Sequence, residues 1–402
     1  MRRALEGIRV LDLSQFLSGP RCTQILAMLG ADVIKVESPS GETMRLLMTL
    51  TASERSLSTL HQNKRGVVVN LKAAEGRAVL AELIAKSDVL VENLAPGMLD
   101  GIGLGYADAR AINPRLVYAS ISGFGQTGPN AGRMAFDIIS QATGGIMAAN
   151  NVSDRPPGVF FGDLTSGAYA ALGILAALRQ RDATGEGQFL DVSMQDVMYY
   201  HHFWGFSERA NEPAKGEIAA LFGRSVTQLL TDPDNPMPFW NSYRATDGYV
   251  AVVALTDRQW EALMRVVGRP DLIGDERFAN LVTRIKNNRE GLAIVEAWMG
   301  ARTVAEIVAA LAEAKIPCGP VASYDQVTHD PHLDARGMYE RVEHPRLGPV
   351  DVPGFPVKMS DADTASRTGC PELGEHTDEV LREVLGYDDA RIAALRDKGA
   401  IN

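Results

Sequence analysis

One acidic residue stands where a carboxylate could do covalent chemistry. Asp163 lies in the run Phe160–Gly167 (FFGDLTSG), after a glycine and at the start of a long apolar segment. An Asp at the start of a helix is commonly its N-cap. The same position keeps a carboxylate ionised through the helix dipole and nearby amides. Beside a bound thioester, such a carboxylate can act as a covalent nucleophile, and spacing alone does not choose between the two roles.

Other patterns typical of catalysis or cofactor binding are weak. Residues 123–128 have GxGxxG spacing, but Pro129 and loop-forming residues follow where a dinucleotide site needs a helix. His329 and His332 form an HxxH pair in a Pro-containing stretch, which favours a solvated loop over a metal site. The sequence holds no Gly-x-Ser-x-Gly elbow, Walker loop or HExxH helix. We therefore predict a turn at the glycines and no metal site.

Strand and helix patterns alternate through the first half of the chain. Short apolar runs predict strands, and amphipathic or Pro-started runs predict helices. The predicted strands are 8–14, 32–37, 88–92, 116–122 and 188–192, and the predicted helices are 20–30, 75–87 and 163–181. Apolar strands separated by helices require a parallel sheet covered on both faces. The predicted fold class is α/β, with a large doubly wound, Rossmann-like domain.

The second half predicts a smaller α+β unit. Residues 206–240 are polar and rich in Pro and Asp, which indicates a loop or linker. Beyond them we predict a strand at 248–254, helices at 257–267, 289–299 and 304–314, and two short helices in the tail after Glu375.

Composition narrows the class of protein. With 402 residues, 46% of them hydrophobic, the chain can build one large core or two smaller ones. A net charge of −10 argues against a bulk nucleic-acid or anionic-membrane binder and leaves room for a local basic pocket. Apolar runs such as 168–178 are shorter than the roughly 20 residues of a membrane span. Cys22, Cys318 and Cys370 are far apart, and the N-terminus runs directly into a strand pattern, so we expect a cytoplasmic protein.

A series of short motifs resembles the family III CoA-transferases, a family that also contains α-methylacyl-CoA racemases. The motifs follow the family's order over nearly the whole chain, which makes the series far more specific than any one member. They lie at 5–13, 19–20, 29–37, 41–45, 63–65, 70–72, 91–93, 122–125, 135–137, 162–163, 184–187, 316–320, 336–337 and 374–377.

The resemblance implies that Asp163 is the catalytic aspartate. Its carboxylate would attack an acyl-CoA thioester and form an aspartyl–acyl anhydride and CoA thiolate. The thiolate would convert the anhydride to an aspartyl-CoA thioester, and an acceptor carboxylate would reverse the exchange. CoA thioesters are then substrates, and no permanently bound cofactor is expected.

The resemblance also implies a set of CoA-contacting residues. Lys72 and Val69 match positions at the nucleotide end of CoA, and Leu17 and Ser18 match positions near the acyl group. The segments between them are Asn93, Leu94 and Ala95, and the stretch from Met134 to Asp137.

Three departures argue against formyl-CoA:oxalate transfer. Gly101 stands where relatives with formyl or oxalyl substrates carry an arginine against adenine. Leu17 replaces a polar residue, and residues 225–241 lack the glycine-rich gating loop of those relatives.

Two alternative functions stay open. The racemases of the family use a His-Asp pair for proton abstraction, but the corresponding residues here are Phe136 and Asp137, so the histidine base is missing. In the other alternative, the chain is one subunit of a heteromer and needs a second, unequal chain. The presence of Asp163 argues against this alternative.

The family resemblance implies an interlocked homodimer and a division of the chain. The large CoA-binding domain would take residues 1–205, a linker 206–240 and the small domain 241–325, and the chain would return to the large domain at 326–402. Such an interface would be obligate.

For the substrates we predict succinyl-CoA or another dicarboxylic acyl-CoA as donor, and a carboxylic acid as acceptor. Arg45, Arg224 and Arg244 are candidates to bind a distal carboxylate. The aromatic stretch 199–206 allows a bulkier or aromatic acceptor as an alternative, unless it only packs in a core or interface. CoA transfer between two carboxylates of one acid also stays open.

Overall fold

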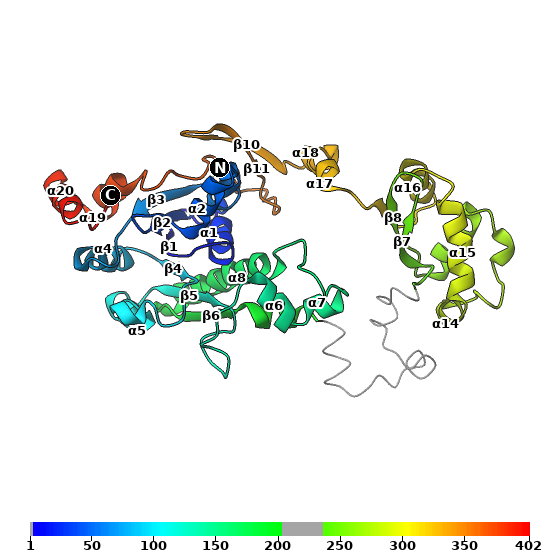
Figure 1. Ribbon diagram of the computed structural model, residues 1–402, viewed down its shortest axis with the longest axis horizontal. Helices are drawn as coiled ribbons and strands as arrows, with labels where there is room; N and C mark the ends of the chain where they lie inside the picture. The colour runs from blue at the N-terminus through cyan, green and yellow to red at the C-terminus, as the bar shows by residue number, and fades with distance from the viewer. Residues whose placement is uncertain (1–2, 203–235) are drawn as a thin grey trace. The chain divides into compact units, whose positions relative to one another are not determined.

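The computed structural model describes residues 3–202 and 236–402, which form two compact units (Figure 1). The first unit runs up to His201 and resumes at Pro331–Asn402, and the second spans His202–Asp330. Most of the predicted linker 206–240 and Arg224 lie outside the described residues.

A parallel sheet of six strands forms the centre of the first unit. Its strand order is β3-β2-β1-β4-β5-β6, and every neighbouring pair is parallel. The strands are β1 (Arg9–Asp12), β2 (Asp32–Glu37), β3 (Lys64–Val68), β4 (Val89–Glu92), β5 (Val117–Ser122) and β6 (Phe189–Ser193). This order is that of a doubly wound fold, in which the chain reverses direction across the sheet between β1 and β4. The predicted α/β class with a parallel sheet is confirmed.

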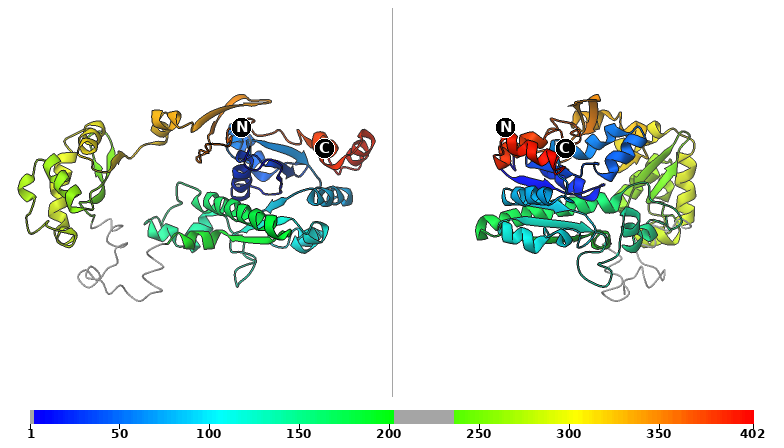
Figure 2. Two further views of the ribbon diagram at one scale, coloured as in Figure 1. Left: turned by 180° about the vertical axis from the view of Figure 1, so that it is seen from behind. Right: turned by 60° about the vertical axis from the view of Figure 1, so that its left-hand side comes forward.

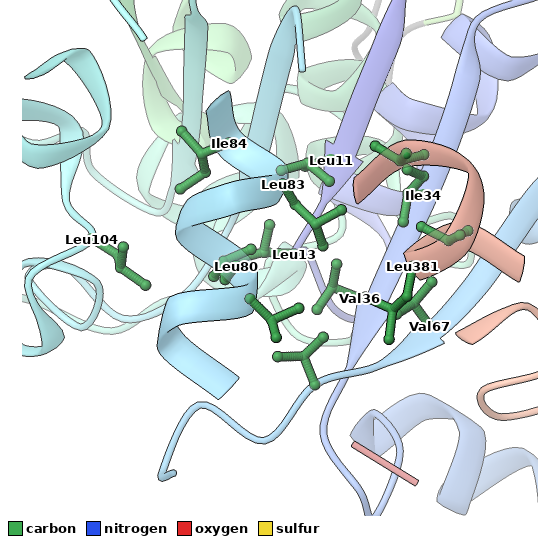
Figure 3. Packing of buried hydrophobic residues seen from close by; sticks show 14 of the residues in the cluster. Leu11, Leu13, Ile34, Val36, Val67, Leu80, Leu83, Ile84, Leu104 and Leu381 are labelled. Atoms are coloured by element: carbon green, nitrogen blue, oxygen red, sulfur yellow. The ribbon is translucent and has the colours of Figure 1, made fainter. Parts of the chain in front are cut away.

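Alternating side chains of the strands build two separate cores. Leu11, Ile34 and Leu90 face the core shared with helix α4 (Ala74–Ala85) and the C-terminal helices α19 (Thr377–Leu385) and α20 (Asp389–Asp397) (Figure 3). Their neighbours Val10 and Val33 face the core shared with α1 (Ser18–Met28) and α8 (Phe161–Thr184). Burial on both faces explains why these strands are continuously apolar.

Further helices and one hairpin complete the first unit, in which helices cover both faces of the sheet (Figure 2). They are α2 (Thr43–Leu50), η1 (Glu54–Leu57), α3 (Ser58–His61), η2 (Asp100–Ile102), α5 (Tyr106–Ile112), α6 (Asp137–Thr143), α7 (Ile146–Ala149), α9 (Met194–Tyr200), α18 (Pro331–Ala335) and the hairpin β10 (Tyr339–His344) and β11 (Gly348–Pro353).

Helix α8 is long and apolar enough to span a membrane by length and composition, and among the described residues it is the one such helix. Half of its apolar window is buried, because Ala170, Ile174 and Ala177 pack into the core that α8 shares with α1 and the sheet. Helix α8 is therefore a core helix.

The second unit has its own core around a small antiparallel sheet, β7 (Trp240–Arg244), β8 (Tyr249–Val253) and β9 (Cys318–Pro320). Trp260, Leu263 and Ile307 lie in this core. The other described elements of the unit are α13 (Asp257–Val266), η3 (Pro270–Leu272), α14 (Leu281–Lys286), α15 (Asn288–Met299), α16 (Val304–Glu313) and α17 (Tyr324–Val327).

Strand β3 was not predicted from its sequence pattern, because it begins with the charged pair Lys64-Arg65. Lys64 is nevertheless buried, since its ammonium group meets the Asp12 carboxylate at 2.9 Å. Tertiary pairing thus overrides the local polarity of this strand.

Candidate active site

Polar loops gather at the carboxyl ends of β1, β4 and β5, where the sheet changes direction. Residues 13–18 follow β1, Asn93–Ala95 follow β4, and Ser122 and Gly123 end β5. Open α/β sheets bind ligands at this edge.

Asp163 reaches this edge from the first turn of α8, and it is not the N-cap of that helix. The helix begins at Phe161 and has Phe160 in the cap position, without a side-chain cap. The backbone N–H of Asp163 instead donates to Oδ1 of Asp137 at 3.0 Å. The capping alternative for Asp163 is therefore wrong, because the carboxylate of Asp137 accepts from a free backbone N–H in the first turn of α8.

The close approach of these two segments requires the glycine that precedes Asp163. A Cβ on Gly162 would lie 2.2 Å from Oγ of Ser140 and 3.1 Å from Oδ1 of Asp137. Any side chain at residue 162 would push α6 away from α8. The Gly-Asp dipeptide thus serves both packing and the placement of the carboxylate.

The environment of Asp163 favours its neutral form. The residue is 8% exposed, and this burial, followed by the nearby charge of Asp137, raises the pKa of Asp163 to about 7. A hydrogen bond from the Ser18 side chain acts in the opposite direction. The sequence-based expectation that the helix end keeps the carboxylate fully ionised near neutral pH is corrected, because burial and the charge of Asp137 raise its pKa.

Ser18 is held in place by Asn93 from the neighbouring strand. The side-chain amide of Asn93 donates to Oγ of Ser18 at 3.0 Å and to the carbonyl oxygen of Gln15 at 2.7 Å. Its carbonyl oxygen accepts from the backbone N–H of Gln15 at 2.7 Å. One side chain therefore fixes both the loop after β1 and the serine that touches Asp163.

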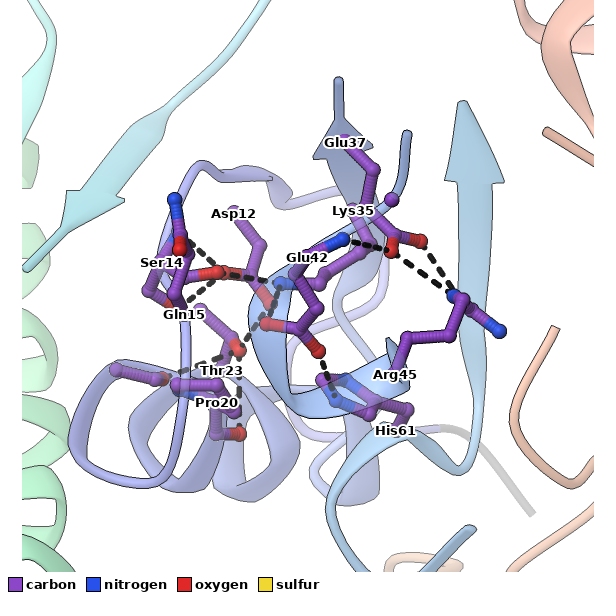
Figure 4. A network of polar contacts seen from close by, with 12 residues as sticks. Asp12, Ser14, Gln15, Pro20, Thr23, Lys35, Glu37, Glu42, Arg45 and His61 are labelled. Carbon is purple, nitrogen blue, oxygen red and sulfur yellow. Dashed lines mark hydrogen bonds and ion pairs between the residues drawn. The ribbon is translucent and has the colours of Figure 1, made fainter. Parts of the chain in front are cut away.

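A buried network of charges supports the same loop from behind (Figure 4). The Asp12 carboxylate accepts from Thr23 at 2.7 Å, from Lys64 at 2.9 Å and from the backbone of Ser14 at 3.0 Å. Burial alone would raise the pKa of Asp12, but the charges of Lys64 and Lys35 outweigh it and hold that pKa well below its usual range. Because the network ties β1, β2 and β3 to α1, it makes the loop rigid.

Three cavities adjoin one another along this edge. The outer cavity, of about 560 Å³, is lined by residues that include Val69, Lys72 and Leu94. The central cavity, of about 210 Å³, shares Gln15, Leu94 and Met98 with it. The apolar cavity, of about 540 Å³, shares Phe16, Phe136 and Asp163 with the central cavity. Asp163 therefore stands at the junction of the central and the apolar cavities.

The candidate catalytic and CoA-contacting residues from the sequence all line these cavities. The outer cavity holds Val69, Lys72 and Leu94; the central cavity holds Ser18, Asn93, Leu94, Ala95, Met134 and Asp163; the apolar cavity holds Leu17, Asp137 and Asp163. Asp137 is 7% exposed, and its second oxygen accepts from Gln141 at 2.7 Å, so its carboxylate is satisfied within the protein.

Two aromatic residues meet at the junction, of which sequence reasoning missed Phe16 and named Phe136 only within the stretch 134–137 and in place of the racemase histidine. The rings of Phe16 and Phe136 meet edge to face, with centroids 5.2 Å apart, and both line the central and the apolar cavities. Phe16 has a φ of 59°, which is costly for a bulky residue and is typical of functional sites. No local signal in the sequence points to this conformation.

Several other candidates lie elsewhere. Arg45 donates to both carboxylate oxygens of Glu37, at 3.0 and 2.8 Å, so its guanidinium is engaged within the protein. Gly101 lines none of the three cavities, and Arg244 belongs to the second unit. His329 lies in an exposed turn, as predicted, whereas His332 lies in the short helix α18, which corrects the expectation of a loop for that residue. No group of potential metal ligands occurs in the described part of the chain.

The GxGxxG stretch forms turns, as predicted. Gly125 and Gly128 have φ values of 81° and 89°, and no helix begins between Gly123 and Phe136. The backbone N–H of Gln126 donates to Asp191 at 2.9 Å, so this loop is tied to the edge strand β6.

Comparison with known proteins decides the family. The family model described as CoA-transferase family III matches residues 5–377. The chain belongs to CoA-transferase family III. It is therefore a CoA-transferase, and the resemblance inferred from the short motifs is confirmed.

Similar family III proteins cover the chain from end to end. A formyl-CoA:oxalate CoA-transferase of Rhodopseudomonas palustris is 37% identical, with 100% of this chain and 98% of the relative covered. A protein of the same name from Streptomyces avermitilis is also 37% identical, with 100% of both chains covered.

Solved structures of similar chains agree with the fold. A CAIB/BAIF family protein from Brucella suis has a TM-score of 0.79 at 32% identity and covers 96% of this chain and 100% of its own. Rv3272 from Mycobacterium tuberculosis has a TM-score of 0.80 at 27% identity and covers 94% of this chain and 98% of its own. Family III CoA-transferases act on CoA thioesters and acids, so these are the substrates that the family implies for this chain.

Proposed function

We propose that Asp163 carries CoA transfer through two kinds of covalent intermediate. Its carboxylate attacks the thioester carbonyl of an acyl-CoA; the C–S bond breaks, CoA leaves as thiolate, and an aspartyl–acyl anhydride forms. The thiolate then attacks the aspartyl carbonyl, which releases the donor acid and leaves an aspartyl-CoA thioester. An acceptor carboxylate attacks the carbonyl of that thioester; the C–S bond breaks, CoA leaves again as thiolate, and a second anhydride joins Asp163 to the acceptor. The thiolate then attacks the acceptor carbonyl of this anhydride, which forms the new acyl-CoA and releases the Asp163 carboxylate.

The observation that carries this proposal is the position of Asp163. It opens on one side to the central cavity, which the outer cavity continues toward Val69 and Lys72. On the other side it opens to the apolar cavity. We propose that CoA lies along the outer and central cavities, in contact with Lys72, Val69, Asn93, Leu94, Ala95, Met134 and Ser18, and that the acyl group lies beyond Asp163 near Leu17 and Asp137.

Proton abstraction, as in a racemase, has less support. The described residues that line the central and apolar cavities include no histidine, and the ring of Phe136 packs on Phe16. Asp137 is also a poor second base, because both of its carboxylate oxygens accept from protein groups, from Gln141 and from the backbone N–H of Asp163.

The donor acid is a separate part of the proposal. Succinyl-CoA or another dicarboxylic acyl-CoA stays the predicted donor, and oxalate in the names of the relatives is also dicarboxylic. The lining near Leu17 and Asp137 does not support this prediction, because its described residues offer no cation to a distal carboxylate. Arg45 gives this choice no support, because it is bound by Glu37. Gly101 and Leu17 remain the reason to assay formyl-CoA and oxalate separately.

The decisive experiment traps the covalent intermediate. The protein is incubated with succinyl-CoA, acetyl-CoA or formyl-CoA, treated with hydroxylamine and digested, and the Asp163 peptide is weighed by mass spectrometry. We expect an adduct that is absent in Asp163→Asn, together with a loss of turnover of about a thousandfold or more. Above pH 7 we expect Asp163→Asn to unfold at a higher temperature than the wild type, since it buries no charge. This result would show that lost activity is not lost folding.

Other outcomes point to the alternatives. No adduct with any donor, together with α-proton exchange into deuterated water, would contradict transfer and support the racemase mechanism. Turnover only after addition of a second chain would support the heteromer.

We also propose that the chain acts as a cytoplasmic homodimer, interlocked as the family resemblance implies. The free Cys22, Cys318 and Cys370 support a reducing compartment. Sedimentation equilibrium should give twice the mass of 43.4 kDa, without dissociation on dilution, because an interlocked pair separates only by unfolding. A monomer at assay concentration would contradict the dimer and leave the chemistry at Asp163 unaffected.

A further inference from the structure

The wall of the apolar cavity is almost free of charge. Its lining contains twelve apolar side chains: Phe16, Leu17, Met44, Leu47, Met48, Leu57, Leu60, Phe136, Ile138, Pro156, Pro157 and Phe160. The described lining residues include no Lys, Arg or His, and the two charged groups among them are the carboxyls of Asp137 and Asp163.

An acid with a second carboxylate fits this wall poorly. Its distal carboxylate would lose contact with water and find no cation in the wall. Burial of such an unpaired group costs several kcal/mol. It would also approach Asp137, whose carboxylate is already held by Gln141 and by the backbone of Asp163. An apolar body gains about 25 cal/mol for each Å² that it removes from water.

The size of the cavity also favours a bulky group. Its volume of about 540 Å³ exceeds the 210 Å³ of the central cavity and lies within the range of roughly 300–1,000 Å³ of pockets that enclose small organic ligands. A formyl or oxalyl group would leave most of this space to water against apolar walls.

Helix α2 supplies the most adaptable part of the wall. Met44, Leu47 and Met48 lie at i, i+3 and i+4 and therefore share one face of the helix. Methionine side chains adjust to ligands of irregular shape. Leu47 is 44% exposed and Phe160 is 58% exposed, so an apolar ligand would cover hydrophobic surface that is now open.

We propose that the preferred acceptor is a monocarboxylic acid with a bulky apolar body, which fills the apolar cavity while its carboxylate reacts at Asp163. This inference rests on the proposed function, because the acid must reach the same carboxylate that carries the CoA thioester. We assign the apolar cavity to a substrate, and not to a second copy of the chain, because the carboxylate of Asp163 opens into it.

The test compares pairs of acceptors in which a terminal apolar group, a methyl or a phenyl, is replaced by a second carboxylate. With a donor that labels Asp163, kcat/KM is measured for hexanoate against adipate, and for 3-phenylpropionate against succinate. We expect each apolar acid to exceed its dicarboxylic counterpart at least tenfold. Equal or better turnover of adipate and succinate, with the Asp163 adduct intact, would overturn the inference and leave the transferase mechanism standing. If no donor labels Asp163, both proposals fail.

A matched pair of variants tests the cavity itself. Met48→Glu places a charge in the wall, whereas Leu50→Glu places one on the same helix at a side chain that is 75% exposed and does not line the cavity. We expect Met48→Glu to raise the KM for hexanoate at least tenfold and Leu50→Glu to leave it unchanged, with both variants folded by circular dichroism. Equal effects of both variants, accompanied by a change in mass in solution, would assign this face to a second copy and overturn the inference.

Discussion

At the scale of single residues, the chemistry depends on the pKa of one carboxylate, that of Asp163. Asp163 must be ionised to attack a thioester, yet burial and the charge of Asp137 raise its pKa to about 7. A carboxylate with a raised pKa is a stronger nucleophile when ionised, and it is ionised in half of the molecules near neutral pH. The hydroxyl of Ser18, which Asn93 holds in place, hydrogen-bonds to the Asp163 carboxylate and partly offsets the rise in its pKa.

The pH dependence of activity should report this balance. Because the protonated form is inactive, kcat/KM should rise with pH through about 7 and then level off. Asp137→Asn keeps an oxygen for the backbone of Asp163 but removes the charge, so the midpoint should move to lower pH. Ser18→Ala removes a hydrogen bond that lowers the pKa, so its midpoint should move to higher pH. Shifts in the same direction would contradict this account.

At the scale of elements, the contact between α1 and α8 positions Ser18 against Asp163. The two helices meet at Gly167, where a Cβ would lie 2.4 Å from the carbonyl oxygen of Ser18 and 2.9 Å from Cβ of Arg21. The absence of a side chain at this residue therefore allows the serine and the aspartate to meet.

Two alanine substitutions in α8 should have opposite effects. Gly167→Ala forces α1 away and should lower the free energy of unfolding by about 1–3 kcal/mol and kcat at least tenfold. At Gly173, a Cβ would meet only Cδ1 of Leu190 at 3.5 Å, so Gly173→Ala should add up to about 1 kcal/mol through helix propensity and leave activity unchanged. Chemical denaturation and steady-state rates measure both effects, and loss of activity in both variants would contradict the packing argument.

At the scale of the whole molecule, the chain leaves the first unit and returns to complete its core. Val380, Leu381 and Ile392 of the C-terminal helices lie in the same core as Leu11 and Ile34 of the first strands. The sheet that carries the site therefore depends on residues more than 300 positions later in the sequence.

Truncation of one buried residue in the tail should show this dependence. Leu381→Ala removes a fully buried side chain and should cost about 2–5 kcal/mol of unfolding free energy. Arg382→Ala, next to it, removes a surface ion pair with Asp389 and should cost less than about 1 kcal/mol. Urea denaturation followed by circular dichroism compares the two, and similar costs would mean that the tail adds little to the core.

The sequence by itself determined the parallel sheet, most of its strands, the family and the position of Asp163 in the chain. These follow from local patterns: continuous apolar strands, helices between them, and short motifs in a recognisable order. Strand β3 was not predicted because it begins with Lys64, whose burial depends on pairing with Asp12, 52 residues away.

Only the tertiary structure decided the character of the site. The pairing of Asp163 with Asp137 joins residues 26 positions apart, and burial together with the charge of Asp137 raises the pKa of Asp163, which a helix end alone would lower. The apolar cavity is built from α2, from the loop before α8 and from the residues around Phe136, and the motifs at 41–45 and 135–137 that overlap these segments do not predict a cavity. Burial and cavity shape arise from side chains brought together across the fold, so no local pattern records them.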